Sequence, residues 1–315
     1  MPHPKPSDYV RSLGWFIRFA PPERRDALNA FYLDVLGLPF LRGGTGQKVD
    51  MYWAGEALVT EVIWEFRGAS YDPLDSHPDT AQTMPFYRVS GLDALVARLE
   101  SRGARVLRLP DADGYRQAAV LEPDVGVVGL RELQGAPVRA QDVEAARRRA
   151  RGEAFNPGCA TMPEGWQELG WVRHRVHDLP AMQRFYATVL DVPVIDATSA
   201  RAWLDLGDNS ILELVPGGRV VPLPANRSEL TAVFILRVQQ REALKERARA
   251  AGGAVVHELI QWDRGELSYL ADPEGHLIGI EERYHPSRYA PRHVCFPEDV
   301  EARRRRAEAV HAAKE

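Results

Sequence analysis

The stretch FYLDVLGLP (residues 31–39) recurs later in the chain as FYATVLDVP (residues 185–193). A Leu-Gly-Trp triplet precedes each copy, at residues 13–15 and again at residues 169–171. In each case a helical pattern of apolar residues lies between the triplet and the end of the stretch. The chain therefore carries one structural unit twice.

The second half of each copy confirms the register of the repeat. Glu122-Pro123-Asp124 is matched by Asp272-Pro273-Glu274, and an apolar run follows each acidic turn. The matches stay in the same order and lie about 150 residues apart, which is the size of a domain and not of a short solenoid repeat. We expect a first domain over 8–155, a second over 164–315 and a linker over 153–166.

Composition narrows the function classes. The chain has 315 residues, of which 45% are hydrophobic and 27% charged, and its net charge is −4. This balance is typical of a globular protein and gives no electrostatic pull towards nucleic acid or anionic membrane. The chain has two cysteines without metal-type spacing, no signal-peptide pattern and no long apolar run. We expect a cytoplasmic protein with no nucleic-acid or membrane partner.

Periodicity predicts the secondary structure of both copies. The expected helices cover residues 26–36, 92–102, 179–190 and 240–251. The expected strands cover 14–20, 49–53, 58–64, 86–89, 116–121, 126–132, 171–176, 202–206, 210–215, 232–238, 266–271 and 276–282. Each copy then ends in an arginine-rich helix, at 141–152 and 298–312, whose interleaved glutamates favour a solvated surface.

These motifs, in this order and repeated, resemble the vicinal oxygen chelate superfamily, which includes glyoxalase I, bleomycin-resistance proteins and extradiol dioxygenases. The resemblance covers about residues 13–133 and 169–283. It implies an α+β fold of two tandem βαβββ modules. Each module consists of paired half-units that curl a mixed sheet around a concave pocket, and the arginine-rich helix follows it.

In metal-dependent members of that superfamily, histidine and carboxylate side chains on four strands hold a divalent ion. In this chain the position on the first strand falls on Trp15 and Trp171, and the position on the last strand on Gly129 and Gly279. The position that opens the second half falls near Met84 and Val233. The carboxylate of a middle strand remains, as Glu61 and Glu213. Since indole and glycine supply no ligand, we expect no metal cofactor.

A divalent metal site stays open as an alternative if a bulge shifts the register of the strands. His174, Glu213 and Glu281 would then converge on one ion. The simpler interpretation of His174 is a hydrogen-bonded, partly buried histidine, because alternation groups it with Val172 and Val176 on a face that packs against helices. His276, which follows the second acidic turn, is expected to be exposed.

Alternation along the strands also predicts which side chains face the pockets. An acid, guanidinium groups and flat aromatic rings suit a planar polar ligand. The candidate ligand-binding residues are Arg173, Trp203, Asp205, Arg237, Tyr269, Glu61 and Arg88. The candidate catalytic residue is Glu213, as a general base. The alternative for Glu213 is a structural ion pair with Arg173 or Arg237.

Three functions follow from these residues. The first is a small-molecule-binding protein of the superfamily that lacks the usual metal site. The second is an enzyme of the same superfamily, a lyase, isomerase or dioxygenase that uses a shifted metal site or Glu213 as base. The third is a non-catalytic scaffold. A homodimer stays open in each case.

Overall fold

The computed structural model describes residues 7–43, 48–55, 58–64, 73–112, 114–123, 126–134, 162–207, 210–224, 229–262 and 265–283. Both expected arginine-rich helices and both cysteines lie outside these residues. Within the described residues, no helix is long and apolar enough to cross a membrane.

The described residues form two eight-stranded mixed sheets with helices packed against them. Sheet A has the strand order β14-β15-β16-β13-β1-β4-β3-β2. Its strands, in chain order, are β1 (Val10–Phe19), β2 (Phe40–Arg42), β3 (Val49–Trp53), β4 (Val59–Ile63), β13 (Ala232–Val238), β14 (Ala254–Trp262), β15 (Gly265–Ala271) and β16 (Leu277–Arg283).

Sheet B has the equivalent order β10-β11-β12-β9-β5-β8-β7-β6. Its strands, in chain order, are β5 (Thr83–Val89), β6 (Val106–Ala112), β7 (Tyr115–Leu121), β8 (Val127–Leu133), β9 (Trp166–Val176), β10 (Val194–Thr198), β11 (Arg201–Gly207) and β12 (Ser210–Pro216). The predicted βαβββ units are confirmed: each sheet contains two four-stranded groups.

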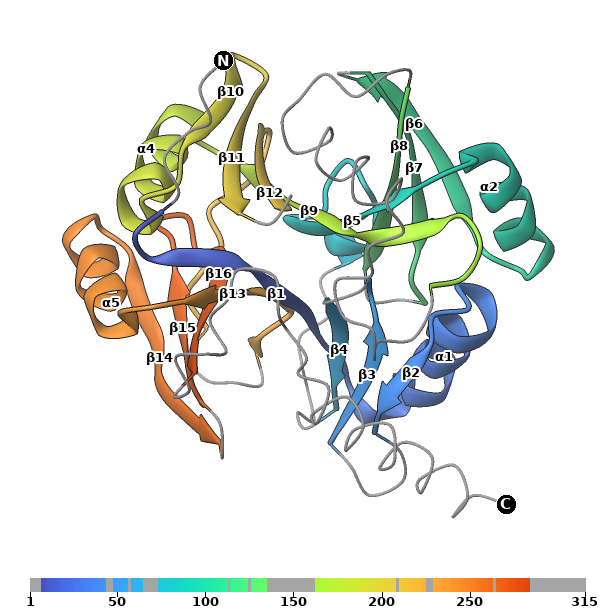
Figure 1. Cartoon of the computed structure of the whole chain (residues 1–315), viewed down its shortest axis with the longest axis horizontal. Coiled ribbons are helices and arrows are strands. Elements are labelled where there is room, and N and C mark those ends of the chain that lie inside the picture. Colours follow the sequence, from blue (N-terminus) through green and yellow to red (C-terminus); the bar gives the residue numbers. More distant parts are fainter. Residues whose placement is uncertain are drawn as a thin grey trace, which may run out of the picture.

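Within the described residues, four helices pack on the same faces of the sheets as the main core. Helix α1 (Arg25–Ala30) continues as one π turn over Phe31–Val35, and α2 is Leu92–Ser101. Helices α4 (Leu179–Leu190) and α5 (Arg241–Ala250) belong to the second repeat. In Figure 1, α4 and α5 lie together on one side of the molecule and α1 and α2 on the other, with the strands between them.

Each sheet combines strands from both repeats. Strand β1 of the first repeat pairs antiparallel with β13 of the second, and β9 of the second repeat pairs antiparallel with β5 of the first. The sequence repeat and the sheet are therefore different units. Residues of the two repeats meet on one surface in both sheets, so each candidate site is composite.

The Leu-Gly-Trp triplets are the points where these central pairs change register. In β1, Leu13 pairs with Leu236 and Trp15 with Ile235, so Gly14 is the extra residue. Gly170 has the same place in β9. A bulge lets two residues on one strand oppose one on its neighbour, so the leucine and the tryptophan of each triplet face opposite sides.

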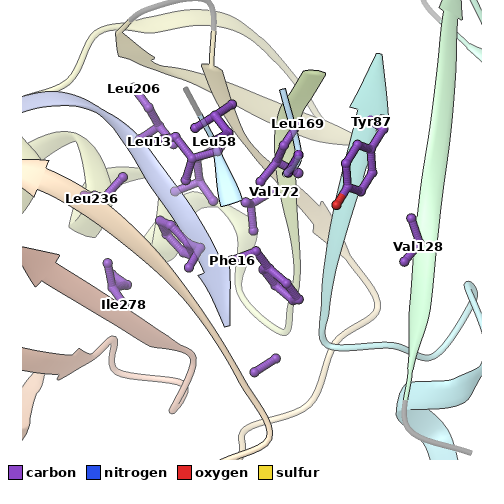
Figure 2. Packing of buried hydrophobic residues seen from close by; sticks show 14 of the residues in the cluster. Leu13, Phe16, Leu58, Tyr87, Val128, Leu169, Val172, Leu206, Leu236 and Ile278 are labelled. Carbon is purple, nitrogen blue, oxygen red and sulfur yellow. The ribbon is translucent and has the colours of Figure 1, made fainter. Parts of the chain in front are cut away.

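The main core lies between the two sheets and under the helices. Leu13, Phe16 and Leu236 of sheet A belong to the same buried cluster as Leu169 and Val172 of sheet B. Figure 2 shows these side chains together where β1 and β9 approach each other. Each sheet has a second face, which points away from this core. We call it the inner face of that sheet, and it carries separate apolar clusters.

All four edge strands, β2, β6, β10 and β14, were missing from the expected strands. For β6 and β10 the cause is exposure. Strands β6 and β10 are largely half-buried or exposed, so they do not show the buried-polar alternation of a covered strand. Hydrogen bonding to the neighbouring strand, and not an apolar pattern, defines these elements.

Candidate functional site

The inner face of sheet B combines apolar and charged side chains. Its apolar part is a buried cluster of mostly aromatic and aliphatic residues: Met84, Phe86, Tyr115, Ala119, Val127, Trp171, Trp203 and Ile211. The predicted alternation of Trp171 and Arg173 against Val172 and His174 is confirmed, because Val172 lies in the main core. This face is the candidate site.

Glu213 on β12 is the centre of the charged part. Nη2 of Arg131 lies 2.9 Å from one carboxylate oxygen and 2.7 Å from the other. Nε of Arg173 donates to Oε2 at 2.7 Å, and Nε1 of Trp203 donates to Oε1 at 3.0 Å. The expected pairing with Arg173 is present, and the second partner is Arg131 instead of Arg237.

These bonds control the ionisation of Glu213. Burial alone would raise its pKa, but the charges and hydrogen bonds of Arg131 and Arg173 outweigh this effect and hold the pKa of Glu213 far below its usual range. Burial lowers the pKa of Arg131, but a guanidinium beside a carboxylate stays protonated at neutral pH. The cluster therefore contains one negative and two positive charges.

Aromatic rings fix the guanidinium groups in place. The Cζ atoms of Arg131 and Arg173 lie 4.3 and 4.5 Å from the centroid of the Phe86 ring. Cζ of Arg88 lies 4.5 Å from the Trp171 ring, and Nη1 of Arg88 donates to Glu168 at 2.8 Å. Such contacts orient the charges as well as stabilising them.

Phe86 also explains the glycine at position 129. The two residues pair across β5 and β8, and a Cβ atom on Gly129 would overlap the Phe86 ring. The space that a carboxylate side chain would need is filled by this ring.

The strands of sheet A pair in the same register as those of sheet B, but the side chains on its inner face differ. Ile235 pairs with Gly279, and a Cβ atom on that glycine would overlap Cδ1 of Ile235. Nε of Arg237 lies 3.6 Å from Glu281, which occupies the position equivalent to Arg131. Glu61 is buried on β4, opposite Ile17. Glu61, Glu281 and Arg237 thus place two carboxylates and one guanidinium on this face.

The alternative metal set is not brought together. His174 contacts His276 and Tyr186 in the core, whereas Glu213 lies on the opposite face of sheet B and Glu281 lies in sheet A. Among the described residues, no group of three or more histidine, cysteine, aspartate or glutamate side chains could hold a metal ion. Of the positions that the resemblance assigns to metal ligands, Trp15, Trp171, Gly129 and Gly279 supply no donor for a divalent ion.

The remaining predicted ligand residues are divided between the sheets. Tyr269 is buried in sheet A, edge-on to Phe19 at 6.4 Å, together with Arg237 and Glu61. Asp205 is half-buried on β11, where it accepts a hydrogen bond from the backbone of Gly207, and burial raises its pKa. Of the predicted residues, Arg173 and Trp203 contact Glu213, whereas Asp205 and Arg88 lie elsewhere in sheet B.

The acidic turns have a structural role that the sequence did not reveal. In the second repeat, Asp272 accepts hydrogen bonds from Tyr186 at 2.8 Å and from the imidazole of His276 at 2.9 Å. The other ring nitrogen of His276 bonds to the carbonyl oxygen of Arg175 at 2.9 Å. The expectation that His276 is exposed was wrong: it joins sheet A to β9 of sheet B and is buried.

The first repeat builds the same link from other residues. Glu122 accepts a hydrogen bond from Tyr32 and forms an ion pair with Arg18 at 2.9 Å. Gly126 stands where the second repeat has His276, and a Cβ atom there would overlap the Arg18 guanidinium. We call these two sets the Arg18 clamp (Arg18, Tyr32, Glu122, Gly126) and the His174 clamp (His174, Tyr186, Asp272, His276).

Arg131 is the main site residue that the sequence did not predict. It belongs to the first repeat, whereas Arg173 and Arg237, the partners predicted for Glu213, belong to the second. The available signal was its position two residues after Gly129, on the same face, just as Glu281 follows Gly279. Recognising it required knowing that β8 and β12 share a sheet.

Known proteins support this architecture. Residues 171–280 match a family model described as "Glyoxalase-like domain". A structure from Bacillus subtilis subsp. subtilis str. 168, described as a "putative dioxygenase", has a TM-score of 0.58 and 12% identity over 96% of this chain and 97% of that chain. Glyoxalase I from Zea mays has a TM-score of 0.56 and 15% identity over 86% of this chain and 92% of that chain. A search of curated proteins finds no match.

The class of the protein follows from these findings: it is a tandem α+β protein with two sheets of paired βαβββ units. More narrowly, it has the glyoxalase-like fold of the vicinal oxygen chelate superfamily, as the repeated motifs predicted. At these identities the similarity to solved structures defines the fold and leaves the chemistry to the residues of this chain.

Proposed function

We propose that the protein binds a small polar molecule with a planar body on the inner face of sheet B, without a metal ion. The observation that carries this proposal is the buried cluster of Glu213, Arg131 and Arg173 beside Trp171 and Phe86. A flat apolar wall with a few fixed polar groups is the usual composition of a small-molecule site.

The cluster favours binding over general-base catalysis. A carboxylate with a strongly lowered pKa takes up a proton poorly near neutral pH. Three donors already occupy the oxygens of Glu213. In this arrangement Glu213 orients Arg131, Arg173 and Trp203, which supports a positioning role.

Equivalent tryptophans allow a matched test. The full chain would be labelled with ¹⁵N and titrated with a panel of neutral and charged aromatic fragments, while the indole N–H signals are followed by NMR. We expect ligands to shift the signals of Trp171 and Trp203. A Trp171→Phe change should weaken binding, whereas Trp15→Phe, at the equivalent position of sheet A, should leave it unchanged.

Two results would reject the proposal. One is a panel in which no fragment shifts the signals of Trp171 or Trp203. The other is stoichiometric iron, manganese, nickel or zinc in the purified chain, which would show that the protein carries a metal ion despite the residues at positions 129 and 171.

A further inference from the structure

The charged cluster of sheet B has an imbalance. Glu213 is the carboxylate shared by Arg131 and Arg173, at 2.7 Å from each. Two guanidinium groups and one carboxylate leave one positive charge in excess. A charge with little access to water is costly unless a counter-charge lies close to it. An anion bound here would therefore be stabilised.

The two arginines use their donors differently. Arg131 binds Glu213 through Nη2 and Gln117 through Nε at 3.0 Å, and only 2% of its side chain is exposed. Arg173 binds Glu213 through Nε, and 14% of its side chain is exposed. Within the described part of the chain, the terminal nitrogens of Arg173 make no hydrogen bond. They are the donors in this cluster that a ligand can reach from solvent.

The surroundings indicate the shape of the ligand. The guanidinium of Arg173 lies over the Phe86 ring and its Nε donates to Glu213, so two contacts hold it in place. Partly buried aliphatic residues border the aromatic cluster: Leu107, Leu109, Leu121, Leu133 and Ile195. An anionic group on a flat apolar body matches a fixed guanidinium beside such a border.

We propose that Arg173 binds the anionic group of a small planar molecule, such as an aromatic carboxylate, and that Arg131 serves as a built-in cation in the place of a metal ion. Arg131 neutralises Glu213, so the charge of Arg173 is available to the ligand. The inference rests on the proposed function and names the chemical class of its ligand.

Benzoate and benzamide are the probes, because they have nearly the same shape and differ in charge. Binding of each to the full chain would be measured by calorimetry and by the indole signals of Trp171 and Trp203. We expect benzoate to bind at least about tenfold more tightly than benzamide, a ratio that corresponds to about 1.4 kcal/mol. Added Mn²⁺ should not change the affinity for benzoate.

Arg173→Met should reduce this preference to about twofold or less, since neutral contacts remain. Arg175→Met is the matched control, on the same strand and face. The guanidinium of Arg175 already donates to the backbone oxygens of Pro216 and Pro78, so it is not expected to bind the ligand. It should keep most of the preference. If Arg173→Met does not fold, judged by near-UV circular dichroism, Arg173→Lys keeps the charge and should give an intermediate preference.

Several results would overturn the inference. They are equal binding of benzoate and benzamide to the unaltered chain, an unchanged preference in Arg173→Met, no response of the sheet B signals to benzoate, and benzoate binding that requires Mn²⁺. Neutral fragments that bind at Trp171 without any preference for an anion would overturn this inference while leaving the proposed function standing.

Discussion

Three matched positions on the inner faces of sheets A and B have the same register and opposite charge. In sheet B, Arg131, Arg173 and Glu213 give an excess of positive charge, and in sheet A the equivalent positions hold Glu281, Ile17 and Glu61. The glycines at 129 and 279 and the tryptophans at 15 and 171 are common to both faces. Duplication preserved the backbone of the site, while its charge diverged.

The largest expected difference concerns the carboxylates. Glu213→Gln would leave Arg131 and Arg173 buried without the anion that both contact, so we expect a loss of about 4 kcal/mol in the free energy of unfolding. Glu281→Gln should cost about 1–2 kcal/mol, because Arg237 lies farther away at 3.6 Å and Glu61 remains on that face. Urea unfolding measures both values. Equal losses would show that the two faces do not differ in this way.

Converting the His174 clamp into the residues of the Arg18 clamp tests a second difference between the repeats. His174→Arg alone would place a guanidinium where the imidazole of His276 lies, so we expect a loss of about 3 kcal/mol. Adding His276→Gly recreates the Arg18 and Gly126 combination and should recover at least about half of that loss. A double-mutant cycle from thermal or urea unfolding gives the coupling, and additive effects would contradict the equivalence of the clamps.

The glycines should differ in their tolerance of a side chain. Gly129→Ala meets the Phe86 ring, which is buried and stiff, and we expect a loss of about 3 kcal/mol. Gly279→Ala meets the end of the Ile235 side chain, which can rotate, and should cost about 1 kcal/mol. The comparison uses the same unfolding measurement. A larger loss at Gly279 would contradict the packing described for the two faces.

The repeats should also differ in their pH dependence, through the His174 clamp. Burial, with the charge of His276, lowers the pKa of His174 from 6.5 to about 3. Below pH 6.5 the unfolded chain therefore takes up a proton that the folded chain does not, so stability falls as the pH is lowered. The slope is about 1.4 kcal/mol per pH unit between pH 6 and pH 4.

Neighbouring groups do not reverse this slope. Burial alone would lower the pKa of His276, but Asp272 and the Arg175 carbonyl raise it. The stabilisation of the folded state by protonated His276 is therefore complete below pH 6.5 and is lost only at higher pH. Stability measured from pH 6 to pH 4 should depend less on pH in His174→Gln than in the unaltered chain. Identical slopes would show that His174 is not neutral in the folded state.

Much of the fold was predictable because burial leaves a regular pattern. The helix over 179–190 was predicted with its observed bounds, and the faces of β9 and β12 followed from alternation. The edge strands were not predictable, because exposed strands carry no such pattern. Pairing between repeats was also not predictable, since no local pattern in β1 identifies β13 as its partner.

The site was predicted only in part for the same reason. Arg173, Trp203 and Glu213 lie in one repeat and share a face, so alternation found them together. Arg131 joins them only through the pairing of β5 with β9, which no local pattern encodes. His276 looked like an exposed residue after a turn because its partners, Asp272 and the carbonyl of Arg175, meet it only in the folded chain.

Because each sheet combines strands of both repeats, the two sheets can be completed only at different times during translation. Sheet B is drawn from one continuous stretch, from Thr83 to Pro216, whereas sheet A joins β1–β4 to β13–β16 at the other end of the chain. Strand β1 is synthesised early, and the edge that pairs with β13 stays unpaired until β13 is made. That exposed edge can pair wrongly with other strands until translation is nearly finished.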